Sequence, residues 1–136
     1  MMVTLTQAGY IKTQGLNAYE AQKRGGRGKK TAQIHAGDYV KTLFVANRLD
    51  NLLCFTSLGN CYRVKVYRLP EGERGSRGRP IANYVELKEG EKVNAILPIK
   101  DFNQEGNVVM TTANGLIKRT SLAAFQHIRK NGVRAI

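Results

Sequence analysis

The chain has 136 residues, 42% of them hydrophobic, which suits one folded domain with a core rather than a disordered arm. Its 22 Lys and Arg against 10 Asp and Glu give a net charge of +12, which favours a polyanionic partner such as DNA or RNA. The lack of Trp and the 7% aromatic content argue against an extended base-stacking surface for single strands. No apolar run approaches the roughly 18 residues of a membrane span, and no leader is visible, so we expect a soluble, cytoplasmic protein with no membrane partner.

The N-terminal third predicts short strands separated by turns. Residues 3–6 and 10–13 are rich in β-forming side chains and flank a two-residue turn at 8–9, which is typical of a hairpin. Residues 33–35 are a short strand candidate, and 39–46 (YVKTLFVA) form a strongly β-branched and aromatic run.

Residues 52–56 and 61–67 predict a second hairpin. With a two-residue turn at 59–60, Phe55 would lie opposite Val64 on a buried face, and the polar side chains would occupy the other face. The sequence therefore predicts a half-buried hairpin.

The remaining strands are predicted at residues 83–87, 92–99, 107–112 and 116–120. A turn at 89–90 precedes the second of these strands, and Pro98 indicates either that this strand ends near it or that the strand lies at a sheet edge. Asn114-Gly115 is the strongest hairpin signal in the chain. Residues 121–129 are the only segment expected to hold a helical turn, with Ser121 as its cap.

Several features recur at intervals of about 50 residues. A threonine precedes each turn (Thr6, Thr56, Thr111), and a cation stands on each returning strand (Lys12, Arg63, Lys118). A Gly-acidic turn recurs at 37–38 and 90–91. Such a repeat indicates propeller-like blades, here 1–50, 51–106 and 107–136, with the last one cut short. Coincidence among similar hairpins is the alternative, but the joint recurrence favours a piece of a larger blade array.

Residues 22–30, QKRGGRGKK, combine dense positive charge with glycine. Such a loop cannot build a core, but it can present cations on a backbone that follows a polyanion closely. A weaker copy, RGSRGR, spans residues 74–79. Nucleotide-binding loops do not fit, because GxxxxGK[ST] and GxGxxG both fail on spacing. A solvated connector and an Arg-Gly RNA-binding segment stay open at this point.

Groups that could support catalysis or metal binding are sparse. Cys54 and Cys61 lack CxxC spacing and a His pair, so we expect two reduced thiols and no zinc site. His35 and His127 have no ligand spacing. The carboxylates are scattered, and those around one predicted turn are expected to face solvent: Glu86, Glu89 and Glu91. We predict no catalytic residue, metal or cofactor in this chain.

Several stretches resemble the C-terminal domain of the A subunit of bacterial DNA gyrase. QKRGGRG at residues 22–28 is similar to that family's glutamine–arginine–glycine box, and VTLTQAGYIK before it and TTANGLIKRT after it agree. The likeness runs along essentially the whole chain. Lys23 stands where Arg is usual, and Arg27 where Lys is frequent; both keep the charge, although Lys23 lacks the bidentate geometry of Arg. Topoisomerase IV subunits share the blades but generally lack an intact box, which favours gyrase and leaves topoisomerase IV as a second alternative.

The resemblance implies a β-pinwheel, an all-β propeller relative whose neighbouring blades exchange strands. The complete domain has six blades, of which this chain would supply two and part of a third. It also implies that duplex DNA wraps around a basic rim and so supports ATP-dependent negative supercoiling. The implied partners are the rest of the gyrase A subunit, together with the gyrase B subunit in a heterotetramer. ATP and magnesium serve other parts of that enzyme, and the implied location is the bacterial cytoplasm, at the nucleoid.

Two groups of residues are predicted to bind DNA. The first group is the box itself: Gln22, Lys23, Arg24, Gly25, Gly26, Arg27 and Gly28. The second group lies along the rim: Lys29, Lys30, Arg63, Lys65, Arg74, Arg77, Arg79, Lys118 and Arg119. Alternatives from other classes are a propeller fragment that binds an acidic protein and an Arg-Gly-loop RNA-binding module.

Overall fold

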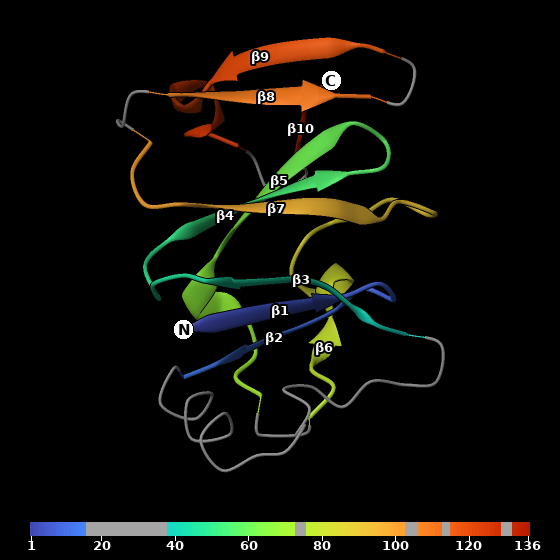
Figure 1. Cartoon of the computed structure of the whole chain (residues 1–136), viewed down its shortest axis with the longest axis vertical. Helices are drawn as coiled ribbons and strands as arrows, with labels where there is room; N and C mark the ends of the chain where they lie inside the picture. The colour runs from blue at the N-terminus through green and yellow to red at the C-terminus, as the bar shows by residue number, and fades with distance from the viewer. Residues whose placement is uncertain (16–37, 73–75, 103–105, 113–114, 129–131) are drawn as a thin grey trace.

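The computed structural model of the chain describes residues 1–15, 38–72, 76–102, 106–112, 115–128 and 132–136. Three β layers follow one another along its longest axis, with the N-terminal layer at one end and the β8–β9 hairpin at the other (Figure 1). The strand predicted at 33–35, the box at 22–28, Lys29, Lys30 and Arg74 lie outside the described residues.

The first layer is a four-stranded antiparallel sheet in the order β3-β1-β2-β6. Its strands are β1 (Met2–Thr6), β2 (Tyr10–Gln14), β3 (Val40–Val45) and β6 (Arg79–Pro80). The hairpin and the long strand predicted in this third of the chain are confirmed. The turn of the hairpin spans three residues rather than two, because the Gly9 amide donates to the Thr6 carbonyl at 3.0 Å. β6 follows the second hairpin, β4–β5, in the sequence, but it pairs with β2. The second repeat therefore donates a strand to the sheet of the first repeat.

The second layer repeats this arrangement in the order β10-β5-β4-β7. It consists of β4 (Asn51–Thr56), β5 (Asn60–Lys65), β7 (Val93–Ile99) and β10 (Val133–Arg134). The third layer is the hairpin of β8 (Asn107–Thr111) and β9 (Ile117–Ser121). β10 is donated by the third repeat as β6 is by the second, which confirms the expected strand exchange. β7 lies at the sheet edge, as its proline predicts.

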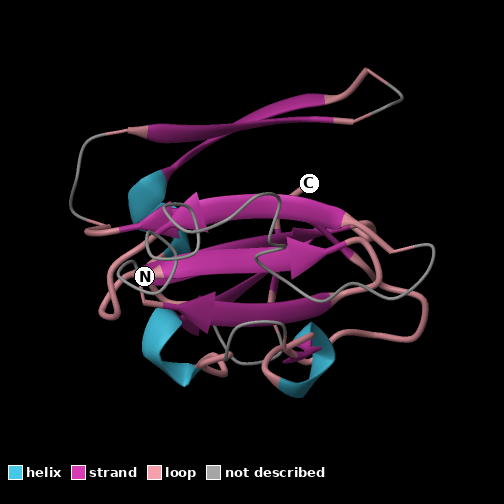
Figure 2. Cartoon of the chain, turned by 60° about the horizontal axis from the view of Figure 1, so that its bottom comes forward, coloured by secondary structure: helices cyan, strands magenta, loops and turns pink. Residues whose placement is uncertain are grey.

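In the described parts of the chain, three short 3-10 helices connect the layers at their margins (Figure 2). They are η1 (Val66–Arg68), η2 (Ile81–Asn83) and η3 (Leu122–Phe125). η3 lies in the segment predicted to be helical, although the Ser121 side chain does not cap it. The strand predicted at 83–87 is wrong, because the Ile81 carbonyl accepts the amides of Tyr84 and Val85 and turns the chain inward. The expectation that 121–129 hold the only helical turn is also wrong.

The predicted register of the second hairpin is wrong. Phe55 pairs with Cys61, and Val64 pairs with Leu52. The turn spans three residues rather than two, since the Gly59 amide donates to the Thr56 carbonyl at 3.1 Å and Gly59 has a φ of +81°. β4 is therefore displaced along β5, and both of its faces are buried.

Two hydrophobic cores lie on the two faces of the second layer. Leu52 and Cys54 point into the core shared with the first layer, whereas Leu53 points into the core shared with the β8–β9 hairpin. In the second core, the rings of Phe55 and Phe125 make an edge-to-face contact at 5.9 Å. β4 is thus a central strand buried on both sides, and the half-buried hairpin expected from the sequence is not observed.

Hydrogen bonds at the turns correct the alignment of the repeats. One threonine in each repeat makes the same two hydrogen bonds: Thr6, Thr56 and Thr112. Its carbonyl accepts a hydrogen bond from the amide of the glycine three residues later in the chain. Its Oγ1 accepts a hydrogen bond from the amide four residues later. Thr112 is therefore the third member of the series, and Thr111 is one residue out of register. On the returning strands, Lys12 pairs with Thr4 and Tyr62 pairs with Cys54, so Tyr62 and not Arg63 corresponds to Lys12.

Candidate nucleic-acid interface

Six of the predicted rim cations lie in the described parts of the chain, and the structure divides them between exposed and half-buried positions. Exposed are Arg63, Arg79, Lys118 and Arg119, and half-buried are Lys65 and Arg77. The glutamine–arginine–glycine box, Lys29, Lys30 and Arg74 fall outside these parts, so their positions stay predictions.

The second basic loop is attached to the first sheet. We call its described residues, 70–72 and 76–81, the first strap. Its two ends bond to β2 and to the preceding turn: the Gly72 amide donates to the Thr13 carbonyl at 2.8 Å, and the Ile81 amide donates to the Gly9 carbonyl at 2.8 Å. Within it, Arg79 pairs with Ile11 through β6 and its side chain is exposed.

Arg63 and Lys65 on β5 are tethered to backbone carbonyls. One guanidinium nitrogen of Arg63 donates to the carbonyl of Gln126, and Nζ of Lys65 donates to the carbonyl of Leu49 at 3.1 Å. Each side chain has further donors, because a guanidinium carries five N–H groups and an ammonium carries three. Both remain able to contact a phosphate without breaking these bonds.

Lys118 and Arg119 are neighbours on β9, so the structure does not bring them to one face. Lys118 pairs with Met110, which packs against the second core, whereas Arg119 pairs with Val109, whose side chain is 63% exposed. One cation therefore stands on the core side of the hairpin and the other on its outer side.

Two basic residues near the predicted interface were not predicted to belong to it, although Lys12 was singled out as a recurring strand cation. Lys12 is 1% exposed, lies under the first strap, and donates from Nζ to the carbonyl of Ser76 at 2.8 Å. Burial lowers the pKa of this ammonium. Arg134 on β10 is exposed and pairs with Asn60. In the first sheet, Pro80 pairs with Tyr10 in the same way, so Arg134 corresponds to Pro80. The repeat spacing could have revealed Arg134, but nothing local distinguishes Lys12 from a solvated strand lysine.

Glu91 is 6% exposed, so its predicted solvent exposure is wrong, whereas Glu86 and Glu89 are exposed as expected. Its carboxylate accepts hydrogen bonds from the Thr56 hydroxyl, from Asn60 Nδ2 at 3.0 Å and from the Tyr62 hydroxyl at 2.8 Å. It also accepts the amide of Lys88 at 2.9 Å. Burial by itself raises the pKa of Glu91, but these hydrogen bonds outweigh it and lower the pKa to about 2. Burial, followed by the bond to this carboxylate, raises the pKa of Tyr62 to about 12.

The two cysteines are buried and unbridged. Burial raises the pKa of both thiols to about 12, so both are protonated at neutral pH. Among the described residues, no three His, Cys, Asp or Glu side chains cluster as metal ligands would.

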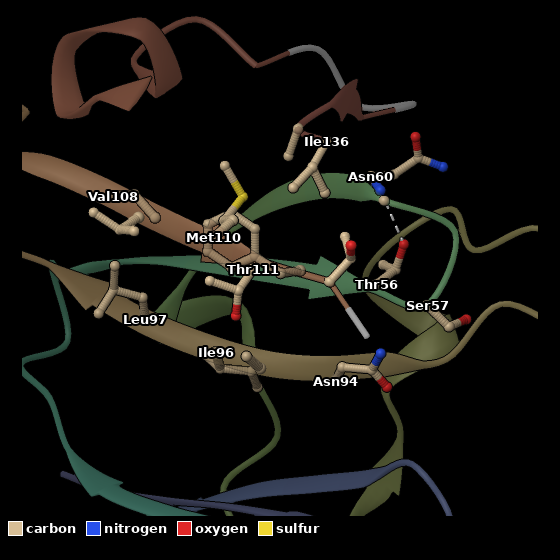
Figure 3. A pocket seen from close by; sticks show the side chains of 16 residues that line it. Thr56, Ser57, Asn60, Asn94, Ile96, Leu97, Val108, Met110, Thr111 and Ile136 are labelled. Carbon is tan, nitrogen blue, oxygen red and sulfur yellow. Dashed lines mark hydrogen bonds between the residues drawn. The ribbon is translucent and has the colours of Figure 1, made fainter. Parts of the chain in front are cut away.

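A groove of ≈ 640 Å³ lies between the second sheet and the β8–β9 hairpin. Figure 3 shows Ile96 and Leu97 of β7 on one side, with Val108 and Met110 of β8 above them and Ile136 at the top of the view. None of the described residues that line it is titratable. The groove offers apolar, hydroxyl and amide groups, and the predicted rim cations are not among its lining residues.

The comparisons with known proteins bear on this repeated architecture. The model of the DNA gyrase C-terminal domain, beta-propeller, matches residues 1–47, 50–100 and 106–136. The chain belongs to the DNA gyrase C-terminal domain family. This membership confirms the all-β, propeller-like fold that the repeat predicts, here as two sheets and part of a third.

Named relatives agree with this family. The DNA gyrase A subunit of Neisseria gonorrhoeae is 54% identical over all 136 residues of the chain, and that of Escherichia coli K12 is 48% identical. The chain spans only 15% and 16% of the length of these two relatives. A topoisomerase IV subunit is not favoured as its source, because relatives of 46% to 54% identity are gyrase A subunits.

Solved structures show the same fold. The crystal structure of the C-terminal domain of DNA topoisomerase IV superposes with a TM-score of 0.80 at 29% identity, over 96% of this chain and 39% of that one. A DNA gyrase A C-terminal domain superposes with a TM-score of 0.70 at 22% identity, over 99% of this chain and 42% of that one. In the described parts of the chain, no helix has the length and apolar character needed to cross a membrane.

Proposed function

We propose that this chain binds duplex DNA independently of sequence and helps to wrap it, as one part of a DNA gyrase A subunit that introduces negative supercoils with ATP. Family membership along nearly the whole chain carries this proposal. The net charge of +12 and the exposed cations of the described residues support it.

Contact with phosphates explains why the cations need no precise base geometry. Lys and Arg that neutralise phosphates release condensed counterions, which gives an affinity that falls steeply with salt. Phosphate contacts fix the position of a protein on DNA, but they carry little sequence information. Arg79 on β6 and Arg63 on β5 are suited to this role, because both are exposed on strands that the sheets hold in place.

The box gives the wrap its direction in our proposal. Gln22 to Gly28 combine cations with glycines, and the glycines let backbone N–H groups approach phosphates closely. Strong bending of 20–30 base pairs costs about 1–6 kcal/mol, so many contacts along the rim must offset it. We assign the strongest contacts to Lys23, Arg24 and Arg27.

The remaining parts of the proposed reaction lie outside this chain. We propose that the longer protein pairs with the gyrase B subunit in a heterotetramer, whose other parts cleave DNA and use ATP and magnesium. This assembly would act in the bacterial cytoplasm, at the nucleoid.

The test is to change Lys23, Arg24 and Arg27 together to Gln in the full-length protein, reconstituted with the gyrase B subunit. Supercoiling of a relaxed plasmid should be lost, because the wrap loses its direction, while relaxation without ATP should persist. The matched control changes Lys88, Lys92 and Lys100 to Gln, which removes the same charge from exposed positions outside the predicted interface. Supercoiling that survives in the box variant would contradict the proposed role of the box.

The competing functions give different binding results. A propeller that binds an acidic protein would hold its partner at a few hundred millimolar salt and in the presence of competitor DNA. An Arg-Gly RNA-binding module would prefer single-stranded RNA to duplex DNA. Duplex binding that weakens steeply with salt excludes both as the main function.

A further inference from the structure

The first strap is fastened to β2 by two side chains of the preceding repeat. Lys12 Nζ donates to the Ser76 carbonyl at 2.8 Å, and the guanidinium carbon of Arg77 lies 3.8 Å from the centroid of the Tyr10 ring. Both Lys12 and Tyr10 project from β2 on the same side, because they are two residues apart on one strand. We call these two contacts, from Lys12 to the Ser76 carbonyl and from Tyr10 to Arg77, the clasp.

The strap fits closely around the aliphatic part of Lys12. A Cβ atom on Gly72 would lie 2.7 Å from Lys12 Cδ, and one on Gly78 would lie 3.0 Å from Lys12 Cβ. Lys12 is 1% exposed, and the strap packs against this side chain at Gly72, Ser76 and Gly78. Lifting the strap would strip a buried ammonium of its carbonyl acceptor, which is unfavourable until water replaces it.

The corresponding place in the second layer is built differently. There Tyr62 takes the position of Lys12, and a Cβ on Gly132 would lie 2.7 Å from its ring. We call residues 132–136 the second strap, since the amides of Ala135 and Ile136 donate to the Gly59 carbonyl as that of Ile81 does to Gly9. The Tyr62 hydroxyl bonds to Glu91 and not to the second strap. Among the described residues, only the first strap, which carries Arg77 and Arg79, accepts a hydrogen bond from a buried lysine of the strand beneath it.

We propose that Lys12 and Tyr10 are positioning residues that fix the first strap so that Arg79 meets a DNA phosphate, while Arg77 serves as part of the clasp. This proposal rests on the proposed function, and it assigns unequal roles to two arginines that the sequence treats alike. Arg79 is exposed and held in register opposite Ile11, whereas Arg77 is half-buried against Tyr10. A side chain held in place loses less freedom when it binds, so the clasp raises affinity without adding a contact.

Hydrogen exchange in the full-length protein without DNA tests the clasp. In Lys12→Met, peptides that contain the Gly72 and Ile81 amides should exchange about tenfold faster, the loss expected when a hydrogen bond to a charged group is removed. The amides of Ala135 and Ile136 in the second strap should not change, which shows that the fold is intact. Lys118→Met, at the corresponding position of β9 where no strap is described, is the matched control and should change neither strap.

Duplex binding as a function of salt tests the roles of the two arginines. Arg79→Gln should flatten the slope of log K against log salt by about 0.9, the value for one lost phosphate contact. Arg77→Gln and Tyr10→Leu should leave the slope unchanged, lower the affinity several-fold and speed exchange in the first strap. Tyr10→Phe keeps the ring and should behave as wild type.

The outcomes separate this proposal from the proposed function. Unchanged exchange in Lys12→Met overturns the clasp, whether or not the protein binds DNA. Equal slope changes in Arg77→Gln and Arg79→Gln overturn the division of roles. A wild-type protein with no salt-dependent duplex binding overturns the proposed function and the DNA role of the strap, and the exchange result then judges the clasp alone.

Discussion

Glu91 joins three parts of the second repeat through one carboxylate. Its carboxylate oxygens accept hydrogen bonds from Thr56 and Asn60, which flank the hairpin turn, and from Tyr62 on the returning strand. They also accept the Lys88 amide, which belongs to the turn that precedes Glu91. In the first repeat, Asp38 has a related place, since its Oδ1 accepts the Ala8 amide at 2.9 Å. The acidic residue of each repeat therefore fastens the strand pair β1–β3 or β4–β7 near the hairpin turn.

Replacing Glu91 with Gln should destabilise the fold by about 1–3 kcal/mol, because a neutral amide cannot accept from all four donors in a buried site. Urea unfolding of the full-length protein, followed at the C-terminal domain, measures this loss. Glu89→Gln, at an exposed position of the same turn, should change the stability by less than about 0.5 kcal/mol. Equal effects of the two variants would contradict the structural role of Glu91.

The pH dependence of stability gives a second reading of the same site. The pKa of Glu91 is lowered in the folded state to about 2 from an ordinary value of 4.5. A lowered folded pKa means that the stabilisation is fully present above the unfolded value and is lost as the pH falls through the folded value. The wild type should therefore lose stability relative to Glu91→Gln between about pH 5 and pH 2. A constant difference between the two proteins across that window would show that the carboxylate does not titrate as described.

At the scale of single elements, the straps depend on glycines at positive φ. Gly78 has a φ of +87°, and a Cβ placed on it would overlap the Ile11 carbonyl oxygen. Gly90 has a similar φ of +76°, but nothing lies within 4 Å of its Cβ position. The two glycines therefore separate the cost of an unusual backbone conformation from the cost of a steric overlap.

Gly78→Ala should destabilise the first sheet by more than Gly90→Ala. The backbone conformation alone costs an L residue about 1–3 kcal/mol, and at Gly78 the displacement of β6 from β2 adds to it. Hydrogen exchange at the Ile81 amide and urea unfolding together measure both parts. If Gly90→Ala is as damaging as Gly78→Ala, the close approach of the strap to β2 contributes nothing to stability.

Local chemistry allowed the hairpins to be predicted, and distant contacts caused the errors. Glycine supplies the positive φ that a tight turn needs, so the hairpins of β1–β2 and β8–β9 could be found from Gly9 and Gly115. The register predicted for β4–β5 was wrong because Gly59, like Gly9 and Gly115, closes a three-residue turn, which the sequence does not distinguish from a two-residue one. Two chain-distant partners were invisible locally: Glu91 is buried by residues 29 to 35 positions away, and Lys12 by Ser76, 64 positions away.

The candidate interface was predictable in composition and not in arrangement. The cationic glycine loops predict a polyanionic partner from charge alone, because phosphate binding needs no exact spacing. Which cations share a surface depends on strand register and pleat. Lys12 is buried, Arg77 lies on a tyrosine, and Lys118 and Arg119 point apart, and each of these facts requires the sheets to be placed.

At the scale of the whole molecule, the three layers limit how a stiff duplex can follow the surface. The β8–β9 hairpin forms one end of the stack (Figure 1), with its core side toward the second sheet and its outer side exposed. A duplex is too wide to enter between the layers, so under the proposed function it would lie along one side of this hairpin. Lys118 and Arg119, on opposite faces of β9, cannot then both be principal phosphate contacts.

Salt titrations of duplex binding by the full-length protein should show this asymmetry. Each phosphate contact contributes about 0.9 to the slope of log K against log salt, so Lys118→Gln and Arg119→Gln should differ, with one near 0.9 and the other near zero. In the double variant the slope of log K against log salt should fall by about 0.9 and not by about 1.8, because one of the two changes removes a charge that does not contact a DNA phosphate. Arg134→Gln, on a different layer, should add its own change to that of the double variant if the duplex continues from the hairpin across β10. A loss near 1.8 in the double variant would mean that DNA reaches both faces of β9, which the described stack of layers does not permit without parting the hairpin from the second core.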